Sequence, residues 1–123
     1  MPRNKMLIRR NVDVEGRAIN AIEGLAVHGD VTVKPLMGGE HMVMLEIRYA
    51  AGSGSPMHVH RHESLCYIVS GRAEATVGEE SFTLGPGDVC RHPEGVPHGI
   101  DAIEDTTVIE VKSPAQPLEQ FLG

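Results

Sequence analysis

Three histidines in this sequence, His58, His60 and His98, have the residue type and spacing of a metal site. Residues i and i+2 of a β-strand lie on one face, so His58 and His60 are expected to point the same way from the start of a strand. A rigid turn with Pro93 and Pro97 is expected to deliver His98 onto a second strand. Converging imidazoles bind divalent transition metals. We therefore predict one such ion, and zinc, nickel, iron and manganese remain candidates.

The elements that must position these histidines are short, β-rich segments. The chain has 14 glycines and 8 prolines spread along it, and valine, isoleucine and threonine are frequent between them. Expected strands cover residues 31–33, 42–49, 65–69, 73–77, 81–84 and 106–111, and a short helical tail is expected at 118–122. Many short strands separated by turns indicate an all-β barrel or sandwich.

The segment 42–49 alternates with a period of two. Val43, Leu45, Ile47 and Tyr49 are expected to line the core. Met44, like the preceding Met42, falls on the opposite face, where a monomer favours polar groups. Irregular packing under a loop is one explanation, and a sheet face covered by a second subunit is the other. We expect a homodimer.

Composition limits the classes of partner. A chain of 123 residues suits one domain. Its net charge of −6 repels phosphate backbones and anionic membrane surfaces, so neither nucleic acid nor membrane is an expected partner. The sequence has no apolar run of about 18 residues, and the cytoplasm is the expected location. Cys66 and Cys90 are expected to be buried thiols.

Two stretches of the sequence resemble the paired motifs of the cupins. The first, residues 52–71, matches at Gly52, His58, His60 and Gly71, and the second, residues 87–102, matches at Gly87, Pro93, Gly95 and His98. The resemblance implies a double-stranded β-helix, or jelly-roll barrel, with residues 1–123 forming a single cupin domain. It also implies that a small molecule binds beside the metal.

The first motif departs from the family pattern at its acidic ligand, because Ser64 occupies that position. A local bulge could turn Glu63 inward and make it the fourth ligand. His62, which shares the parity of His58 and His60, is a second candidate. The third possibility is a site with only three histidine ligands, which resembles that of the thiol and diketone dioxygenases.

A narrower resemblance is to the short cupins of pectin degradation, which convert unsaturated uronates to linear ketouronates. This resemblance rests on the Gly38-Gly39-Glu40 turn, the segment 67–71 and the Ser113-Pro114 tail. The resemblance implies an acidic residue near that tail, where this chain has Glu110. The arginine of the family is replaced by Gln116.

Parity places Glu110 and Lys112 on one face of the segment 106–112. If that face is internal, Glu110 could act as a general base while the metal polarises a substrate carbonyl. The alternative is an exposed glutamate on an edge strand. His92, just before Pro93, could donate a hydrogen bond in support of the site or be exposed, and exposure is the favoured expectation.

Three functions are compatible with these residues. The first is a metal-dependent isomerase or lyase acting on a small carbonyl, sugar-acid or hydroxy-acid substrate. The second is a three-histidine metal dioxygenase. The third is a non-catalytic cupin that binds a small molecule.

Overall fold

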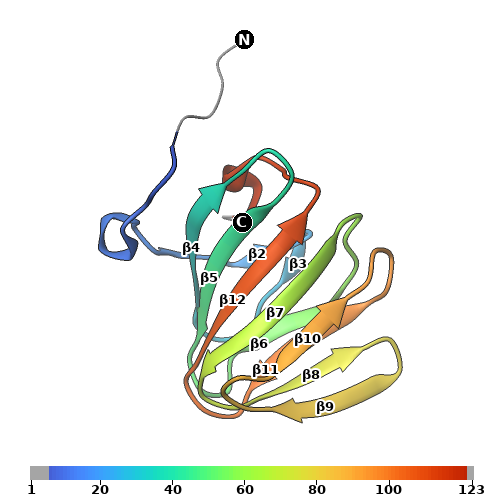
Figure 1. Cartoon of the computed structure of the whole chain (residues 1–123). Helices are drawn as coiled ribbons and strands as arrows, with labels where there is room; N and C mark the ends of the chain where they lie inside the picture. Colours follow the sequence, from blue (N-terminus) through green and yellow to red (C-terminus); the bar gives the residue numbers. More distant parts are fainter. Residues whose placement is uncertain (1–5, 122–123) are drawn as a thin grey trace.

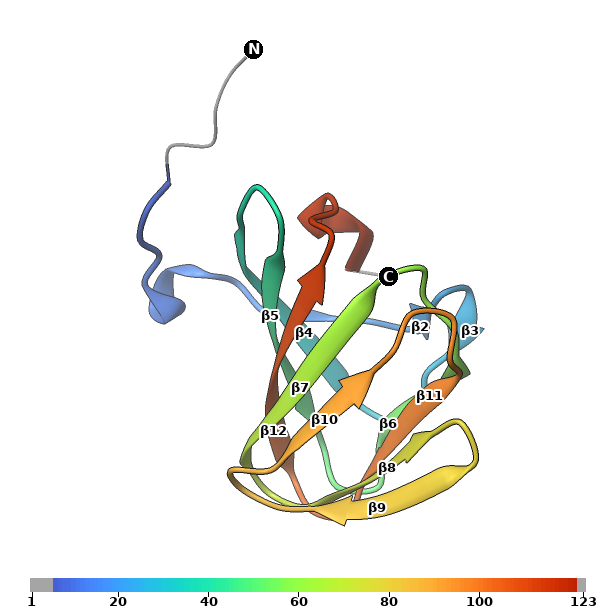
Figure 2. The ribbon, with the colours of Figure 1, turned by 45° about the vertical axis from the view of Figure 1, so that its right-hand side comes forward.

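The computed structural model describes residues 6–121, which form two antiparallel β-sheets that face each other (Figures 1 and 2). The larger sheet has the order β1 (Arg17–Ala18), β4 (Val31–Gly38), β5 (Val43–Tyr49), β12 (Thr106–Ser113), β7 (Glu63–Ser70), β10 (Val89–His92). The smaller sheet has the order β6 (Gly54–His58), β11 (His98–Ala102), β8 (Ala73–Val77), β9 (Glu80–Leu84). A separate hairpin consists of β2 (Ala21–Ile22) and β3 (Leu25–Ala26).

The all-β jelly-roll prediction is confirmed, and each of the six expected strands is present. The helical tail is a single 3-10 turn, η2 (Leu118–Phe121), and another such turn, η1 (Asn11–Asp13), lies near the other end of the chain. Leu122, which the expected tail included, lies outside the described residues. Neither turn is long and apolar enough to cross a membrane.

The core lies between the two sheets. Val43, Leu45, Ile47 and Tyr49 are all buried, so the predicted inner face of β5 is confirmed. Other strands add Ile68, Val108 and Ala75 to the same core. Cys66 and Cys90 are buried free thiols, as predicted, and they are direct partners in the register of β7 and β10.

The inner face of β12 carries charge as well as apolar groups. Thr106, Val108, Glu110 and Lys112 are all buried on this face. β12 lies in the middle of the larger sheet, between β5 and β7. The alternative of an exposed glutamate on an edge strand is therefore wrong for Glu110, which faces the barrel interior.

The connection from β6 to β7 departs from the expected geometry. The sequence placed His58 and His60 at the start of one strand, but β6 ends at His58 and β7 begins at Glu63. Alternating burial nevertheless continues through this connection: His58, His60, His62 and Ser64 are buried, and Val59, Arg61 and Glu63 are exposed. An extended connection has thus kept the histidines on one side without strand pairing.

Candidate metal centre

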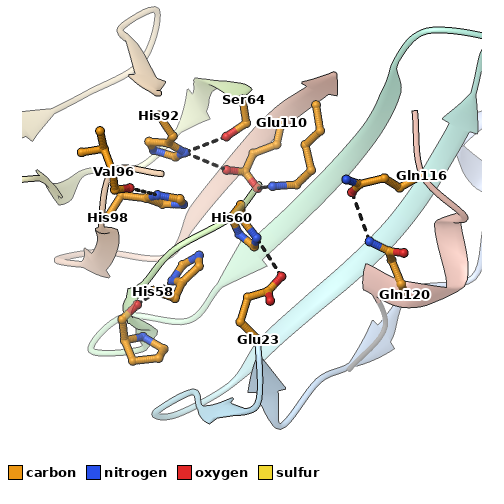
Figure 3. Close-up of polar contacts among 12 residues, drawn as sticks. Glu23, His58, His60, Ser64, His92, Val96, His98, Glu110, Gln116 and Gln120 are labelled. Atoms are coloured by element: carbon orange, nitrogen blue, oxygen red, sulfur yellow. Dashed lines mark hydrogen bonds and ion pairs between the residues drawn. The ribbon is translucent and has the colours of Figure 1, made fainter. Parts of the chain in front are cut away.

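His58, His60 and His98 form a compact cluster in the interior of the barrel (Figure 3). β6 and β11 are antiparallel, and their register sets His98 directly opposite His58. His60 follows in the connection after β6. One ring nitrogen from each histidine lies within 4.8 Å of the other two, and all three residues are buried.

Hydrogen bonds fix the orientation of each ring. His58 Nδ1 donates to the Pro56 carbonyl at 2.7 Å, and His98 Nδ1 donates to the Val96 carbonyl at 3.2 Å. His60 Nδ1 donates to the Glu23 carboxylate at 2.8 Å. Carbonyl and carboxylate oxygens only accept, so in each ring the proton is on Nδ1 and the Nε2 lone pair is left for a metal.

Burial also keeps these rings neutral. It lowers the pKa of His58, and with Lys112 and the neighbouring histidines it lowers the pKa of His60 to about 2. Burial, together with His92 and His58, lowers the pKa of His98 to about 3. Because a metal binds the deprotonated imidazole nitrogen, neutral histidines are ready ligands at pH 7.

The structure separates the two candidates for a fourth ligand. His62 stacks on His60 with ring centroids 4.4 Å apart, and its buried Nε2 has no hydrogen-bond partner within residues 6–121. It lies outside the three-histidine cluster. Glu63 points away from the barrel interior, is half-exposed and pairs with Arg91 at 3.2 Å. No bulge turns Glu63 inward.

Ser64, which occupies the position of the family's acidic ligand, is buried and engages another histidine. Its Oγ lies 2.9 Å from Nδ1 of His92, and the His92 ring stacks on His98 with centroids 4.0 Å apart. The expectation that His92 is exposed was wrong. β10 alternates, so His92 faces inward together with Cys90, and the apolar character of Cys90 was the signal that could have revealed it.

Glu110 links this histidine to a buried cation. Its Oε1 lies 3.6 Å from His92 Nδ1, and its Oε2 lies 3.5 Å from Lys112 Nζ. Burial raises the pKa of Glu110, but Lys112 and the surrounding histidines outweigh it and hold the pKa at about 2. Glu110 is therefore a carboxylate at neutral pH.

These groups line a cavity of about 390 Å³ inside the barrel. The histidines, Glu110 and Lys112 form its polar part, and Ile47, Leu84 and Phe121 contribute to its apolar part. This volume suits a small metabolite. Phe121 belongs to η2, so the C-terminal turn forms part of the cavity wall.

Comparison with known proteins identifies the family. Residues 45–111 match the family model of the cupin domain. The chain belongs to the cupin family. The cupin assignment made from the two sequence motifs is thereby confirmed, and the histidine cluster of this cupin lies at those motifs.

Known relatives agree with the cupin assignment. Over 91 residues the cupin is 31% identical to oxalate decarboxylase OxdC of Bacillus subtilis (strain 168); this stretch is 70% of the chain but only 24% of the decarboxylase. An RmlC-like cupin from Shewanella frigidimarina NCIMB 400 superposes with a TM-score of 0.80 at 22% identity, covering 91% and 94% of the two chains. KdgF from Halomonas sp. gives 0.76 at 23% identity, covering 89% and 95%. The two structures show a shared fold.

Proposed function

We propose that this cupin is a metal-dependent enzyme of the isomerase or lyase type that acts on a small carbonyl, sugar-acid or hydroxy-acid substrate. The observation that carries the proposal is the buried Glu110–Lys112 pair beside three neutral histidines in one cavity. Burying a charged group costs roughly several kcal/mol even after the protein relaxes around it. Packing alone therefore gives no reason for the charges of Glu110 and Lys112 in this cavity.

The donor set fits a divalent transition metal such as zinc, nickel, iron or manganese. The Nδ1 atoms of His58, His60 and His98 are all hydrogen-bonded, so the Nε2 lone pair of each ring is left to bind the ion. His62 lies outside this cluster, so we propose three histidine ligands with the remaining positions of the ion open to water or substrate. When bound, the ion supplies Lewis-acid polarisation of a substrate oxygen.

Proton transfer is assigned to Glu110 and His92 together. The low pKa of Glu110 makes its carboxylate a weak base, whereas His92 is neutral because burial lowers its pKa. Ser64 and Glu110 both engage Nδ1 of His92, so its Nε2 is the nitrogen left to exchange a proton. Glu110 stabilises the imidazolium that forms when His92 accepts a proton.

Lys112 is the proposed partner of an acidic substrate group. Its Nζ is buried, faces the cavity and lies 5.6 Å from the centroid of the Phe121 ring. The similarity to an oxalate decarboxylase and the motif resemblance to the uronate-linearising cupins both support a small acid as substrate.

Turnover of small acids tests this proposal. Metal-loaded protein would be assayed with unsaturated uronates, oxalate and short hydroxy acids, by product chromatography and carbon dioxide release. We expect turnover by the wild type, loss of it in His60→Ala, and a fall of about 10²–10⁴-fold in Glu110→Gln. Glu63→Gln, on the outer face, is the control and should retain activity. Unchanged turnover in His60→Ala would refute the proposal.

A three-histidine dioxygenase is the second candidate, and Ser64 favours it. The Ser64 hydroxyl, at the position of the family's acidic ligand, contacts His92. Within residues 6–121, the cluster of His58, His60 and His98 contains no carboxylate. Oxygen uptake by the iron-loaded protein with thiol and diketone substrates would establish this activity. Ligand-induced thermal shifts without any product would instead support a binding-only cupin.

A further inference from the structure

Glu23 lies in a tight turn whose backbone conformation is unfavourable for glutamate. It follows β2, and with Gly24 it forms the two-residue turn to β3; φ is 51° at Glu23 and 75° at Gly24. Two positive φ values are typical of a primed hairpin turn, in which asparagine, aspartate or glycine is preferred at the first position. A glutamate there is strained because its Cβ approaches the following carbonyl.

The side chain at this turn reaches the metal cluster. Glu23 Oε1 lies 2.8 Å from Nδ1 of His60, and Figure 3 shows the carboxylate pointing at that ring. His58 and His98 donate instead to carbonyls only two residues before each of them. His60 alone among the three depends on a distant segment, and its acceptor alone is charged.

The hairpin is fixed to the strand that leads to the cluster. His28, just after β3, donates its N–H to the Gly54 carbonyl at 3.2 Å, and Gly54 donates in return at 3.0 Å. Val27 donates to Asn20 at 2.9 Å and closes the base of the hairpin. Gly54 begins β6, which ends at His58, so the tip of the hairpin has a defined position relative to the cluster.

We propose that Glu23 is a positioning residue of the metal centre, which holds His60 with Nδ1 protonated and Nε2 directed at the ion. The inference rests on the proposed metal binding. A carboxylate on the far side of a ligand imidazole fixes its tautomer and strengthens it as a donor, and losing such a partner typically weakens metal affinity by about 10–100-fold. Glu23 lies outside residues 45–111, which match the cupin model, so the family match does not assign it.

Substitutions at the turn separate strain from ligand positioning. Glu23→Gly removes the carboxylate and relieves the strain, Glu23→Asn tolerates the turn but is one methylene too short, and Glu23→Gln keeps a hydrogen-bond acceptor. Glu119→Gln, which removes one charge from the exposed surface of η2, is the matched control. Zinc and cobalt dissociation constants would be measured by chelator competition, with the visible spectrum of the cobalt form and the unfolding midpoint of the metal-free protein.

We expect Glu23→Gly and Glu23→Asn to weaken metal binding by about 10–100-fold and to alter the cobalt spectrum, while the metal-free unfolding midpoint changes little because relieved turn strain offsets the lost hydrogen bond to His60. Glu23→Gln should lose less affinity, and Glu119→Gln should match the wild type. Wild-type affinity and spectrum in Glu23→Gly would overturn the positioning role alone. A lower midpoint combined with wild-type affinity would also overturn it, because Glu23 would then act on hairpin stability alone. A wild type that binds neither metal would overturn the proposed function as well.

Discussion

The barrel interior contains polar as well as apolar side chains, and among them Glu110 and Lys112 form a buried ion pair. Removing one member of a buried ion pair leaves an uncompensated charge, which typically destabilises by about 3–5 kcal/mol. Glu110→Gln is therefore expected to lower the free energy of unfolding by that order in urea denaturation of the metal-free protein.

A second substitution tests whether the unpaired Lys112 charge causes this loss of stability. In Glu110→Gln with Lys112→Met, neither charge remains, and most of the lost stability should return. If the double variant is as unstable as Glu110→Gln alone, the charge pair is not the reason for the loss.

The buried histidines predict how stability depends on pH. Their pKa values are lowered in the folded protein, to about 2 for His60 and about 3 for His98. Below the unfolded value of about 6.5, the unfolded chain binds protons that the folded chain does not, so stability falls as pH falls. The metal-free protein should lose up to about 1.4 kcal/mol per pH unit for each such histidine between pH 6 and 4.

Denaturation midpoints measured at several pH values test this directly. The stability of His98→Gln should depend less steeply on pH than that of the wild type. A flat profile between pH 7 and 4 would contradict neutral buried histidines.

Residue spacing was sufficient to select His58, His60 and His98, because strand periodicity and a proline-rich turn limit where such side chains can point. His92 was misjudged because its neighbour Pro93 suggested an exposed turn, whereas the register of β10 with β7 decides its direction. Glu23 was not identified at all. Its contact with His60 spans 37 residues and depends on a turn whose sequence lacks the usual asparagine or aspartate.

Secondary-structure elements were predictable where side chains alternate. β5 showed this alternation, and its expected range agrees with the strand to within one residue. β7 and β12 were expected from their apolar and β-branched composition, and their ranges agree to within two residues at each end. β4, expected only at 31–33, continues to Gly38. β6 was not delimited, because it contains Gly54 and Pro56, which are unfavourable in strands. The pairing of β6 with β11, which sets His58 opposite His98, is a tertiary contact that no local pattern reports.

Two motif glycines with similar backbone angles should differ in their tolerance of alanine. Gly71 has φ 93° and a Cβ there would lie 2.2 Å from the Asp105 carbonyl oxygen. Gly87 has φ 91° but open space around it. Gly87→Ala should cost about 1–3 kcal/mol from backbone strain alone, and Gly71→Ala should cost at least about 1 kcal/mol more.

Urea denaturation of both glycine variants measures the difference. Equal losses would show that the close contact at Gly71 relaxes without cost.

On the scale of the whole molecule, the outer face of the larger sheet carries an apolar patch bordered by Glu46 and Arg91. Neighbouring register rows place Met44, Val111 and Leu65 in one line and Ile109, Tyr67 and Val89 in the next. Met44, Leu65, Tyr67 and Val89 are each at least 42% exposed. Such a face on a small protein is typical of an interaction surface, and we propose a second copy of the chain as its occupant.

The dimer proposal predicts a twofold molecular mass in light scattering after size exclusion. Leu65→Glu with Tyr67→Glu should shift the protein to the monomer mass while the far-ultraviolet circular dichroism spectrum stays unchanged. A monomeric wild type at high micromolar concentration would contradict it.

The most direct test of the metal centre is elemental analysis of the purified protein beside a variant with both His58→Ala and His60→Ala. A metal centre with three histidine ligands predicts about one equivalent of a divalent transition metal in the wild type and none in the variant, with both proteins folded. The absence of metal from the wild type, even after reloading with zinc, nickel, iron and manganese, would contradict it.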